Sequence, residues 1–311
     1  MFTTVVGSYP VNLKSPDNFK DKLINIFGFY DPYKIAIKEA VISQLDAGID
    51  VVSDGQVRGD MIGSFVKYIP GFIFEKNSSV IVNKIQKPHS EITTSDIKYA
   101  KEILTHHIGE DRNKGVKGII TGPSTIIHSS RIESFYKNKN QAILDLAKSL
   151  KYEIDAISKI GAKYIQIDEP FLSTGMVDIK TASEAINILS KNTKTPISIH
   201  VCGNLENIFK DLCNFNVDII DCEFAGNNQN LKVLEDNIRF LENKKIGFGC
   251  VDTTLNKVDD IDSVRTLVSK GIELVGYDNL ILDPDCGLKK IDNDIAFKKL
   301  QLINKVREDL G

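Results

Sequence analysis

The chain has 311 residues, of which 42% are hydrophobic and 26% are charged, which is enough for one large globular core or two small domains. A net charge of −3 and a pI near 6.0 exclude the strongly basic surface of a nucleic-acid-binding protein. There is no run of about 18 apolar residues, and the first residues lack the basic and apolar regions of a signal peptide. We therefore expect a cytoplasmic protein that does not span a membrane.

The predicted elements alternate about eight times between short apolar strands and longer helical segments. The expected strands are Thr3–Val6, Val51–Ser53, Gly118–Thr121, Tyr164–Ile167, Ile197–His200, Val217–Ile220, Ile246–Gly249 and Leu280–Leu282. Helical periodicity is clearest in Ala36–Leu45 and Gln141–Ile160. This pattern predicts an α/β protein with a single domain, residues 1–311, folded as a (β/α)₈ TIM barrel. A doubly wound sheet is the alternative.

One segment does not fit a plain strand–helix unit. Residues 65–85 alternate between apolar and polar side chains on either side of Asn77-Ser78-Ser79. This alternation predicts a β-hairpin inserted after the second strand of the barrel.

Polar residues and cysteines gather directly after the predicted strands. They are Ser8, Asp54, Arg58, Asp60, Ser124, Asp168, Glu169, His200, Cys202, Asp221, Glu223, Cys250, Asp252, Asp283, Asp285 and Cys286. In a parallel barrel these strand ends meet on one face, where active sites lie. The sequence therefore predicts one functional site at that face.

The strongest local motif is His-x-Cys at the end of the fifth strand. Residues i and i+2 of a strand point to the same side, so His200 and Cys202 can reach one metal ion. Zinc takes about four nitrogen, sulfur or oxygen ligands. Later strand ends offer Glu223 and Cys286, with Cys250 as the reserve. An isolated His-x-Cys is more often a core histidine beside a buried cysteine. The additional cysteine and glutamate at later strand ends favour a metal site instead.

The five cysteines are an odd number, which indicates free thiols or ligands in a reducing compartment. We expect Cys213 and Cys222 to be small buried side chains. A zinc ion with two thiolate ligands and a carboxylate is electron-rich. It suits the binding of a further thiol as a nucleophilic thiolate better than the activation of water.

The remaining motifs carry less information individually. Asp168 at a strand end offers a carboxylate to a substrate ammonium group, or else caps a helix. Gly7-Ser8 and Gly122-Pro123-Ser124 offer backbone N–H groups to a carboxylate, or else form simple turns. The polar segment 54–60 is equally well explained as a surface cluster of ion pairs.

Taken together, these motifs resemble the catalytic barrel of cobalamin-independent methionine synthase. The resemblance runs from residue 1 to about residue 290 and rests on motifs that occur in the family's order. They are Val6-Gly7-Ser8-Tyr9-Pro10, Arg58-Gly59-Asp60-Met61, Thr121-Gly122-Pro123, Gln166-Ile167-Asp168-Glu169-Pro170, His200-Val201-Cys202-Gly203, Glu223 and Pro284-Asp285-Cys286-Gly287-Leu288-Lys289.

The resemblance implies roles for individual residues. It implies one Zn²⁺ per chain with four ligands, which are His200, Cys202, Glu223 and Cys286. It also implies that homocysteine binds at Gly7, Ser8 and Asp168. Cys250 is not a ligand in the family pattern. The implied reaction transfers a methyl group to the homocysteine thiol and forms methionine.

The chain departs from the long enzymes of this family in three ways. The long enzymes carry a second, N-terminal barrel, whereas this sequence starts directly at the expected catalytic barrel. It lacks every Trp, although the long enzymes stack folate on one. It has Thr254 where those enzymes have a proton-donating His, so no catalytic acid is assigned. The chain resembles the short archaeal-type methionine synthases. That likeness implies methylcobalamin or a methyl-corrinoid protein, rather than methyl-tetrahydrofolate, as the methyl donor.

Two other functions are compatible with the motifs. One is a zinc thiol methyltransferase of the coenzyme M type, related to uroporphyrinogen decarboxylase, which shares the barrel and the His-x-Cys motif. The other is a non-catalytic zinc-binding protein, in which all four ligands are permanent.

Overall fold

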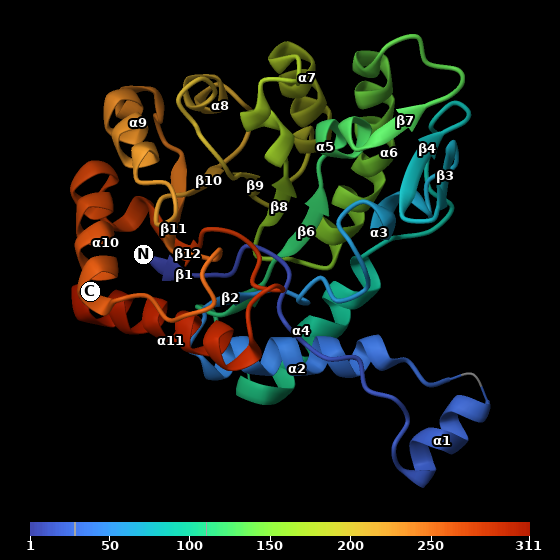
Figure 1. Cartoon of the computed structure of the whole chain (residues 1–311), viewed down its shortest axis with the longest axis horizontal. Coiled ribbons are helices and arrows are strands. Elements are labelled where there is room, and N and C mark those ends of the chain that lie inside the picture. The colour runs from blue at the N-terminus through green and yellow to red at the C-terminus, as the bar shows by residue number, and fades with distance from the viewer. Residues whose placement is uncertain (28, 110) are drawn as a thin grey trace.

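The computed structural model describes residues 1–27, 29–109 and 111–311. A curled parallel sheet forms its centre, and helices pack around the outside (Figure 1). The strands of this sheet, in chain order, are β1 (Phe2–Thr3), β6 (Gly118–Thr121), β8 (Ile165–Asp168), β9 (Ile197–Val201), β10 (Ile219–Glu223), β11 (Lys245–Val251) and β12 (Leu280–Pro284). They pair in the order β1-β12-β11-β10-β9-β8-β6. The predicted α/β class is confirmed.

A second parallel pair lies between the two edges of this sheet. It consists of β2 (Val51–Val52) and β5 (Gly115–Val116). Thr4, which follows β1, forms an isolated parallel bridge with Val51. On the other side, the backbone N–H of Lys117, between β5 and β6, donates to the Val52 carbonyl over 2.9 Å. These contacts continue the curl of the main sheet.

The helices follow the strands along the chain. They are α1 (Phe19–Ile26), α2 (Pro32–Asp46), α3 (Gly63–Val66), α4 (Thr94–Ile108), α5 (Pro123–His128), α6 (Lys139–Lys159), α7 (Ile179–Ser190), α8 (Phe209–Cys213), α9 (Gln229–Asn237), α10 (Ile261–Val275) and α11 (Asn293–Leu310). The predicted segment Ala36–Leu45 lies inside α2, and Gln141–Ile160 ends one residue beyond α6. Most of their apolar residues are buried in the core. Within the described ranges, no helix has the length and apolar character needed to cross a membrane.

The segment predicted as a hairpin contains the end of α3 and two antiparallel strands, β3 (Phe72–Glu75) and β4 (Ser78–Ile81). Lys76 and Asn77 make the turn with φ of 50° and 59°. A third strand, β7 (Ser130–Ile132), pairs in parallel with β4 and was not expected. It follows α5, far along the chain, so this small sheet joins two loops on the same side of the molecule (Figure 1).

Side chains alternate between two environments along β8. Ile165 and Ile167 belong to the large apolar core shared with the helices, whereas Tyr164, just before β8, packs in a separate small cluster. The other buried members of that cluster are Val51, Ile219 and Ile281, from three other strands. Period-two alternation therefore places Gln166 and Asp168 on the same inner side as Tyr164, nearer the carboxyl ends of the strands.

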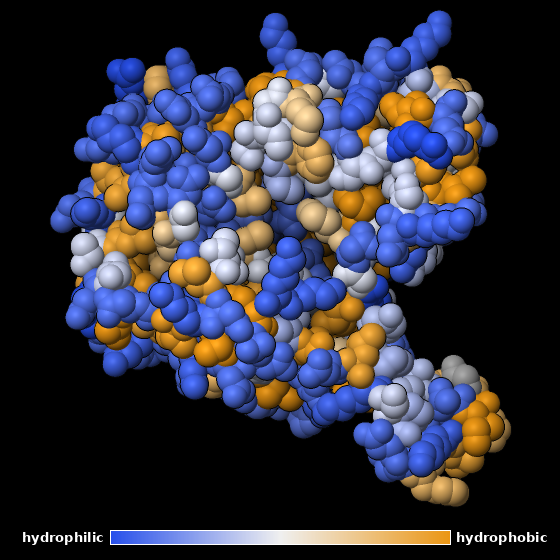
Figure 2. Space-filling view, viewed as in Figure 1, coloured by the Kyte–Doolittle hydropathy of each residue, from blue (hydrophilic) through white to orange (hydrophobic). Residues whose placement is uncertain are grey.

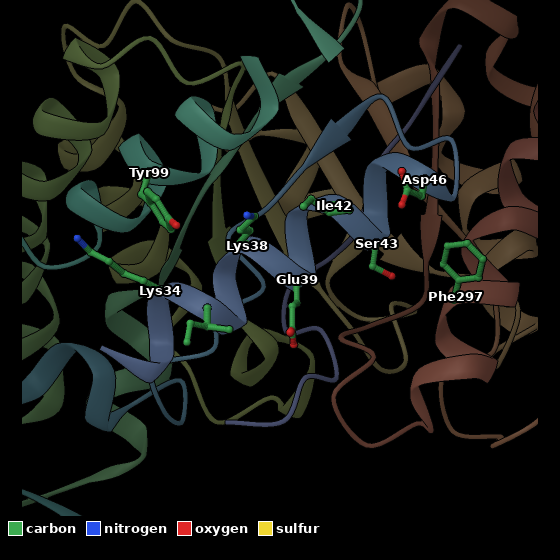
Figure 3. A pocket seen from close by; sticks show the side chains of 9 residues that line it. Lys34, Lys38, Glu39, Ile42, Ser43, Asp46, Tyr99 and Phe297 are labelled. Carbon is green, nitrogen blue, oxygen red and sulfur yellow. The ribbon is translucent and has the colours of Figure 1, made fainter. Parts of the chain in front are cut away.

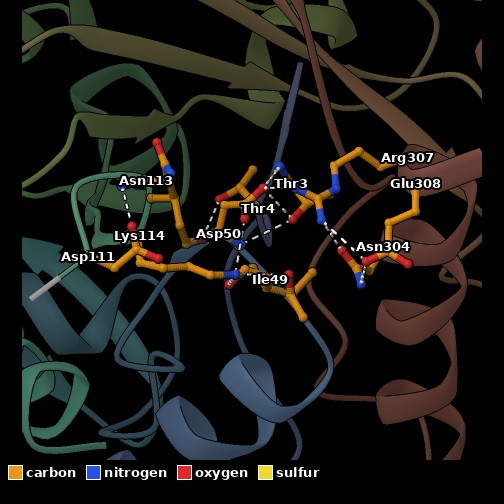
Figure 4. A network of polar contacts seen from close by, with 12 residues as sticks. Thr3, Thr4, Ile49, Asp50, Asp111, Asn113, Lys114, Asn304, Arg307 and Glu308 are labelled. Carbon is orange, nitrogen blue, oxygen red and sulfur yellow. Dashed lines mark hydrogen bonds and ion pairs between the residues drawn. The ribbon is translucent and has the colours of Figure 1, made fainter. Parts of the chain in front are cut away.

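The amino-terminal end of the sheet is held by a network around Asp50 (Figure 4). The Asp50 carboxylate accepts hydrogen bonds from the backbone N–H and the hydroxyl of Thr3, at 2.9 and 3.1 Å. Lys114 and Arg307 make ion pairs with it at 3.0 and 3.2 Å. This carboxylate thus links β1, the start of β2, β5 and α11, at the end of the sheet opposite the predicted site.

Helix α1 stands apart from the rest of the molecule and carries exposed apolar side chains (Figures 1 and 2). Phe19 is 84% exposed and Ile26 is 76% exposed. The helix lies in the long connection between β1 and α2, which starts at the carboxyl end of β1.

Candidate metal centre

Three of the four predicted zinc ligands meet at the carboxyl ends of β9 and β12. The ligand atoms of His200, Cys202 and Cys286 all lie within 4.8 Å of one another. His200 and Cys202 come from the end of β9, and Cys286 lies two residues beyond β12. A spacing of this size lets one small ion contact all three atoms. The group does not contain Cys250, which is buried and directs its sulfur to the Asp283 carbonyl over 3.5 Å.

The His200 ring is fixed by a carboxylate on the neighbouring strand. Its Nδ1 lies 3.0 Å from Asp221 Oδ1, and His200 is only 3% exposed. Its Nε2 is buried and has no hydrogen-bond partner among the described residues. A histidine that ligates a metal typically gives its other ring nitrogen to a carboxylate in this way. The unpartnered Nε2 beside two sulfurs therefore fits a metal ligand.

The two thiols differ in their proton affinity. The hydrogen bond from Cys202 and the nearby His200 outweigh burial and lower the pKa of Cys286. The same hydrogen bond, together with burial, raises the pKa of Cys202. Cys286 is thus the thiol that ionises first. Because zinc binds thiolates, a thiol whose pKa is lowered favours metal binding.

Glu223, the fourth predicted ligand, lies beside the group but outside it. It is the last residue of β10 and is half-buried. Burial raises the pKa of Glu223, while the backbone N–H of Gly203 donates to its carboxylate and opposes that rise. Its role as a ligand stays a prediction. Because the Glu223 carboxylate lies away from the three other predicted ligands, its position is compatible with a ligand that a substrate group can replace.

Asp168 ends β8 next to His200, with which it is paired in the sheet register. Gln166 Nε2 donates to Asp168 Oδ1 over 2.6 Å, and the fully buried Lys117 donates to Gln166 Oε1 over 2.5 Å. Burial raises the pKa of Asp168 to about 6, although His200 and the Gln166 hydrogen bond lower it. The carboxylate is therefore oriented, and it is ionised near neutral pH.

Ser8 lies directly beside the Cys286 segment. A Cβ at Gly287 would lie 2.5 Å from Ser8 Oγ, and the backbone N–H of Leu288 donates to the Ser8 carbonyl over 2.7 Å. Gly7 is covered by Gln56, because a Cβ at Gly7 would lie 2.6 Å from Gln56 Oε1. The structure thus brings the Gly7-Ser8 turn to the predicted metal group.

Sequence reasoning assigned no individual role to several polar residues of this region. Gln56, which has a positive φ of 45°, was read only as part of a polar segment. In that segment Arg58 pairs with Asp31 and Asp96, which agrees with the ion-pair explanation. Asp283 is fully buried, and neither of its oxygens has a hydrogen-bond partner among the described residues. Burial and the nearby Asp221 raise the pKa of Asp283. Polar side chains at every second position of a strand are the sequence signal that could have identified interior residues such as Asp283.

The residue that caps a helix here is Glu169, and not Asp168. Glu169 is buried and accepts hydrogen bonds from the backbone N–H groups of Ser124 and Thr125, at 2.9 and 2.7 Å. These are first-turn donors of α5. Gly122 makes room for the carboxylate, because a Cβ there would lie 2.2 Å from Glu169 Cδ. The Gly122-Pro123-Ser124 turn is therefore occupied by the protein's own carboxylate.

A surface hollow elsewhere on the molecule contains none of the predicted site residues (Figure 3). It lies along the outer side of α2, with Tyr99 of α4 and Phe297 of α11 at its edges. The chemistry-bearing group is therefore separate from this hollow.

Comparison with known proteins identifies the family of the chain. The family described as "Cobalamin-independent synthase, Catalytic domain" matches residues 1–309. The chain belongs to the cobalamin-independent methionine synthase family. It is therefore an enzyme of the methyltransferase class, as predicted. Membership does not support the coenzyme M-type or non-catalytic alternatives.

Relatives within the family match along the whole chain. The methionine synthase of Methanothermobacter thermautotrophicus is 47% identical over 303 residues, which cover 97% of each chain. That of Methanocaldococcus jannaschii is 44% identical over 314 residues, which cover 97% of this chain and 96% of the relative. A B12-independent methionine synthase from Shewanella sp. W3-18-1, solved with selenomethionine, covers 99% of this chain and 97% of its own, with a TM-score of 0.85. Its 21% identity supports the fold alone.

Thr254, the position that the resemblance matches to the family's proton-donating histidine, makes two hydrogen bonds with Asp252. The Thr254 hydroxyl and backbone N–H both donate to Asp252 Oδ1, at 2.7 and 2.8 Å. The hydroxyl is thus engaged in a turn that follows β11. This arrangement gives no sign of a general acid at that position.

Proposed function

We propose that the chain uses one zinc ion to methylate the thiol of homocysteine, forming methionine. The observation that carries this proposal is the convergence of His200, Cys202 and Cys286, whose ligand atoms lie within 4.8 Å of one another, with the buried Nε2 of His200 unpartnered. Glu223 would supply the fourth ligand. When bound, zinc would lower the pKa of the substrate thiol and keep the sulfur nucleophilic.

The protein's own residues would orient the amino acid. Asp168, held by Gln166, would accept the substrate ammonium group, since its carboxylate is fixed and ionised near neutral pH. Backbone N–H groups at Gly7 and Ser8 would receive the substrate carboxylate. Both groups border the sulfur ligands, so the substrate thiol would lie at the metal.

The transfer itself is a displacement at carbon. The substrate sulfur attacks the methyl carbon and forms the new S–C bond, while the bond from carbon to the donor breaks. The leaving group keeps the electron pair of that bond. A proton is needed only if the leaving group is a poor one, such as the amine nitrogen of a folate.

We also propose that residues 1–311 form a single catalytic (β/α)₈ barrel with the β3–β4 hairpin as an insertion. The main sheet contributes seven strands, and β2 with β5 bridges its two edges through Thr4–Val51 and Lys117–Val52. In such a barrel, catalytic residues lie at the carboxyl ends of the strands, where His200, Asp168 and Glu223 are found.

For the methyl donor we propose methylcobalamin or a methyl-corrinoid carried on a protein. The family is named for synthases that work without cobalamin, and the proposal departs from the family in this respect. Its support is the absence of Trp from the whole sequence and the engagement of the Thr254 hydroxyl with Asp252. Cobalt(I) leaves with its electron pair and needs no proton, so an enzyme without a general acid suits that donor.

A donor comparison tests this proposal. Zinc-loaded protein and homocysteine are incubated with methylcobalamin or with methyl-tetrahydrofolate, and methionine is measured. We expect transfer from methylcobalamin, at a modest rate because a carrier's binding energy is absent, and negligible transfer from the folate. Efficient turnover with methyl-tetrahydrofolate would contradict the donor assignment while leaving the homocysteine assignment intact.

A further inference from the structure

One carboxylate beside the metal group receives three consecutive backbone N–H groups. Asp285 Oδ1 accepts from Phe224 and Ala225, both at 3.0 Å, and Asp285 Oδ2 accepts from Gly226 at 2.6 Å. These three residues follow Glu223, and Asp285 itself precedes Cys286. The contact therefore joins the chain after one predicted ligand to the chain before another.

The sheet is shaped to receive this carboxylate. A Cβ at Gly249 of β11 would lie 2.4 Å from Asp285 Oδ1 and 2.7 Å from Asp285 Cα, so only glycine fits between the two strands. The pairing of β11 with β12 shifts register between Gly249 and Val251. The Asp285 backbone N–H then donates to the Val251 carbonyl over 3.1 Å. The position of the carboxylate is thus set by three adjoining strands.

A second buried side chain holds the other flank of the same ligand. Asn230 of α9 has no exposed surface. Its Nδ2 donates to the Glu223 carbonyl at 2.8 Å and to the Gly203 carbonyl at 2.9 Å, while its Oδ1 accepts from Leu205 N–H at 3.1 Å. Asn230 therefore ties the end of β10 to the loop that carries Cys202.

We propose that Asn230 and Asp285 are positioning residues that together form a backbone clamp on Glu223. The clamp holds the Glu223 carbonyl from one side and the following N–H groups from the other, so the backbone is fixed relative to Cys202 and Cys286. The clamp contacts hold the backbone around Glu223 and not its carboxylate. With zinc bound, such a backbone would keep the carboxylate within reach of the metal if an incoming thiol took its place. The inference rests on the zinc site of the proposed function.

The test uses full-length Asp285→Asn and Asn230→Ala. In Asp285→Asn the amide keeps one acceptor oxygen but turns an N–H group toward either Gly226 or the pair formed by Phe224 and Ala225. Asn230→Ala removes the contacts on the other flank, and alanine has a high helix propensity. The control is Glu153→Gln, another fully buried carboxylate that accepts backbone N–H groups, here from Ile92, Thr93 and Thr94.

Three quantities are measured for each protein: the melting temperature, the zinc dissociation constant by competition with a coloured chelator, and the absorption spectrum after cobalt(II) substitution. We expect both clamp variants to raise the zinc dissociation constant about 10- to 100-fold. Their cobalt ligand-field bands should shift, while the sulfur-to-cobalt charge-transfer band of two thiolates persists. The Glu153→Gln protein should lose thermal stability only.

The outcomes separate the two proposals. If the wild-type chain binds no zinc, both the proposed function and the clamp are wrong. The clamp alone is overturned if the wild-type chain binds zinc and both clamp variants keep its zinc affinity and its cobalt spectrum. In that case the variants would lose only thermal stability, as the control does. Should Asp285→Asn not fold, Asn230→Ala decides, because it removes the contact with the Glu223 carbonyl, on the flank opposite the N–H groups that Asp285 binds.

Discussion

At the scale of single residues, the two cysteines at the ends of β11 and β12 have very different surroundings. Cys286 lies within 4.8 Å of the ligand atoms of His200 and Cys202, whereas Cys250 is buried against the Asp283 carbonyl. We expect Cys286→Ser to lose most of its zinc and its activity, because a serine hydroxyl is a poor replacement for a thiolate. Cys250→Ser is the matched control and should keep about one zinc per chain. Metal analysis of the purified variants decides, and the reverse result would show that the wrong cysteine was assigned.

Asp168 offers a test of substrate binding that leaves the metal in place. A charged hydrogen bond of this kind contributes about 1.5–3 kcal/mol. Asp168→Asn should therefore raise the KM for homocysteine about ten-fold or more, with zinc content unchanged. Steady-state kinetics and metal analysis on the same preparation give both quantities. An unchanged KM would remove Asp168 from the binding site.

The same carboxylate predicts a pH dependence. Burial raises the pKa of Asp168 to about 6, so the group is ionised above that pH and neutral below it. The attraction for the substrate ammonium group is present above about pH 6 and is lost as the pH falls through it. We expect the KM for homocysteine to rise between about pH 7 and pH 5 in the wild type. A KM profile in Asp168→Asn that rises just as steeply would assign the titration to another group.

At the scale of elements, the network around Asp50 predicts a change in stability without a change in chemistry. Asp50→Ala leaves Thr3, Lys114 and Arg307 without their shared acceptor, at the end of the sheet opposite the site. We expect the free energy of unfolding to fall by about 2–3 kcal/mol. Urea unfolding measures this, and the KM for homocysteine should stay at the wild-type value.

The control for that variant is an exposed ion pair. Asp236 pairs with Lys232 over 2.9 Å on the surface of α9. Asp236→Ala should change the free energy of unfolding by about 0.5 kcal/mol or less. A loss in Asp50→Ala no larger than this would mean that the network does not stabilise the sheet.

The elements also show what sequence reasoning can and cannot reach. The pairing of His200 with Cys202 follows from period-two alternation, and the approach of Cys286 follows from parallel strands ending on one face. Strand β7 escaped prediction because its pairing with β4 joins loops far apart in the chain, and short-range patterns hold no such information. The position of Glu223 outside the ligand group depends on a side-chain conformation, which spacing alone does not determine.

At the scale of the whole molecule, the residues that stabilise the sheet and the residues of the candidate site lie at opposite ends of the strands. The apolar cluster of Val51, Tyr164, Ile219 and Ile281 and the Asp50 network occupy the amino-terminal end of the sheet. The ligand group and Asp168 occupy the carboxyl ends of the strands. The family match spans residues 1–309. We propose that the chain binds homocysteine through its sulfur at the ligand group.

Zinc K-edge X-ray absorption of the full-length protein tests that claim most directly, because it counts the sulfur atoms bound to the metal. Without substrate, we expect two sulfurs at about 2.3 Å and two lighter ligands at about 2.0–2.2 Å. With homocysteine, a third sulfur should appear at about 2.3 Å as the Glu223 oxygen leaves. A sulfur count that stays at two when homocysteine is saturating would contradict the account, since the thiol would then react without binding the metal.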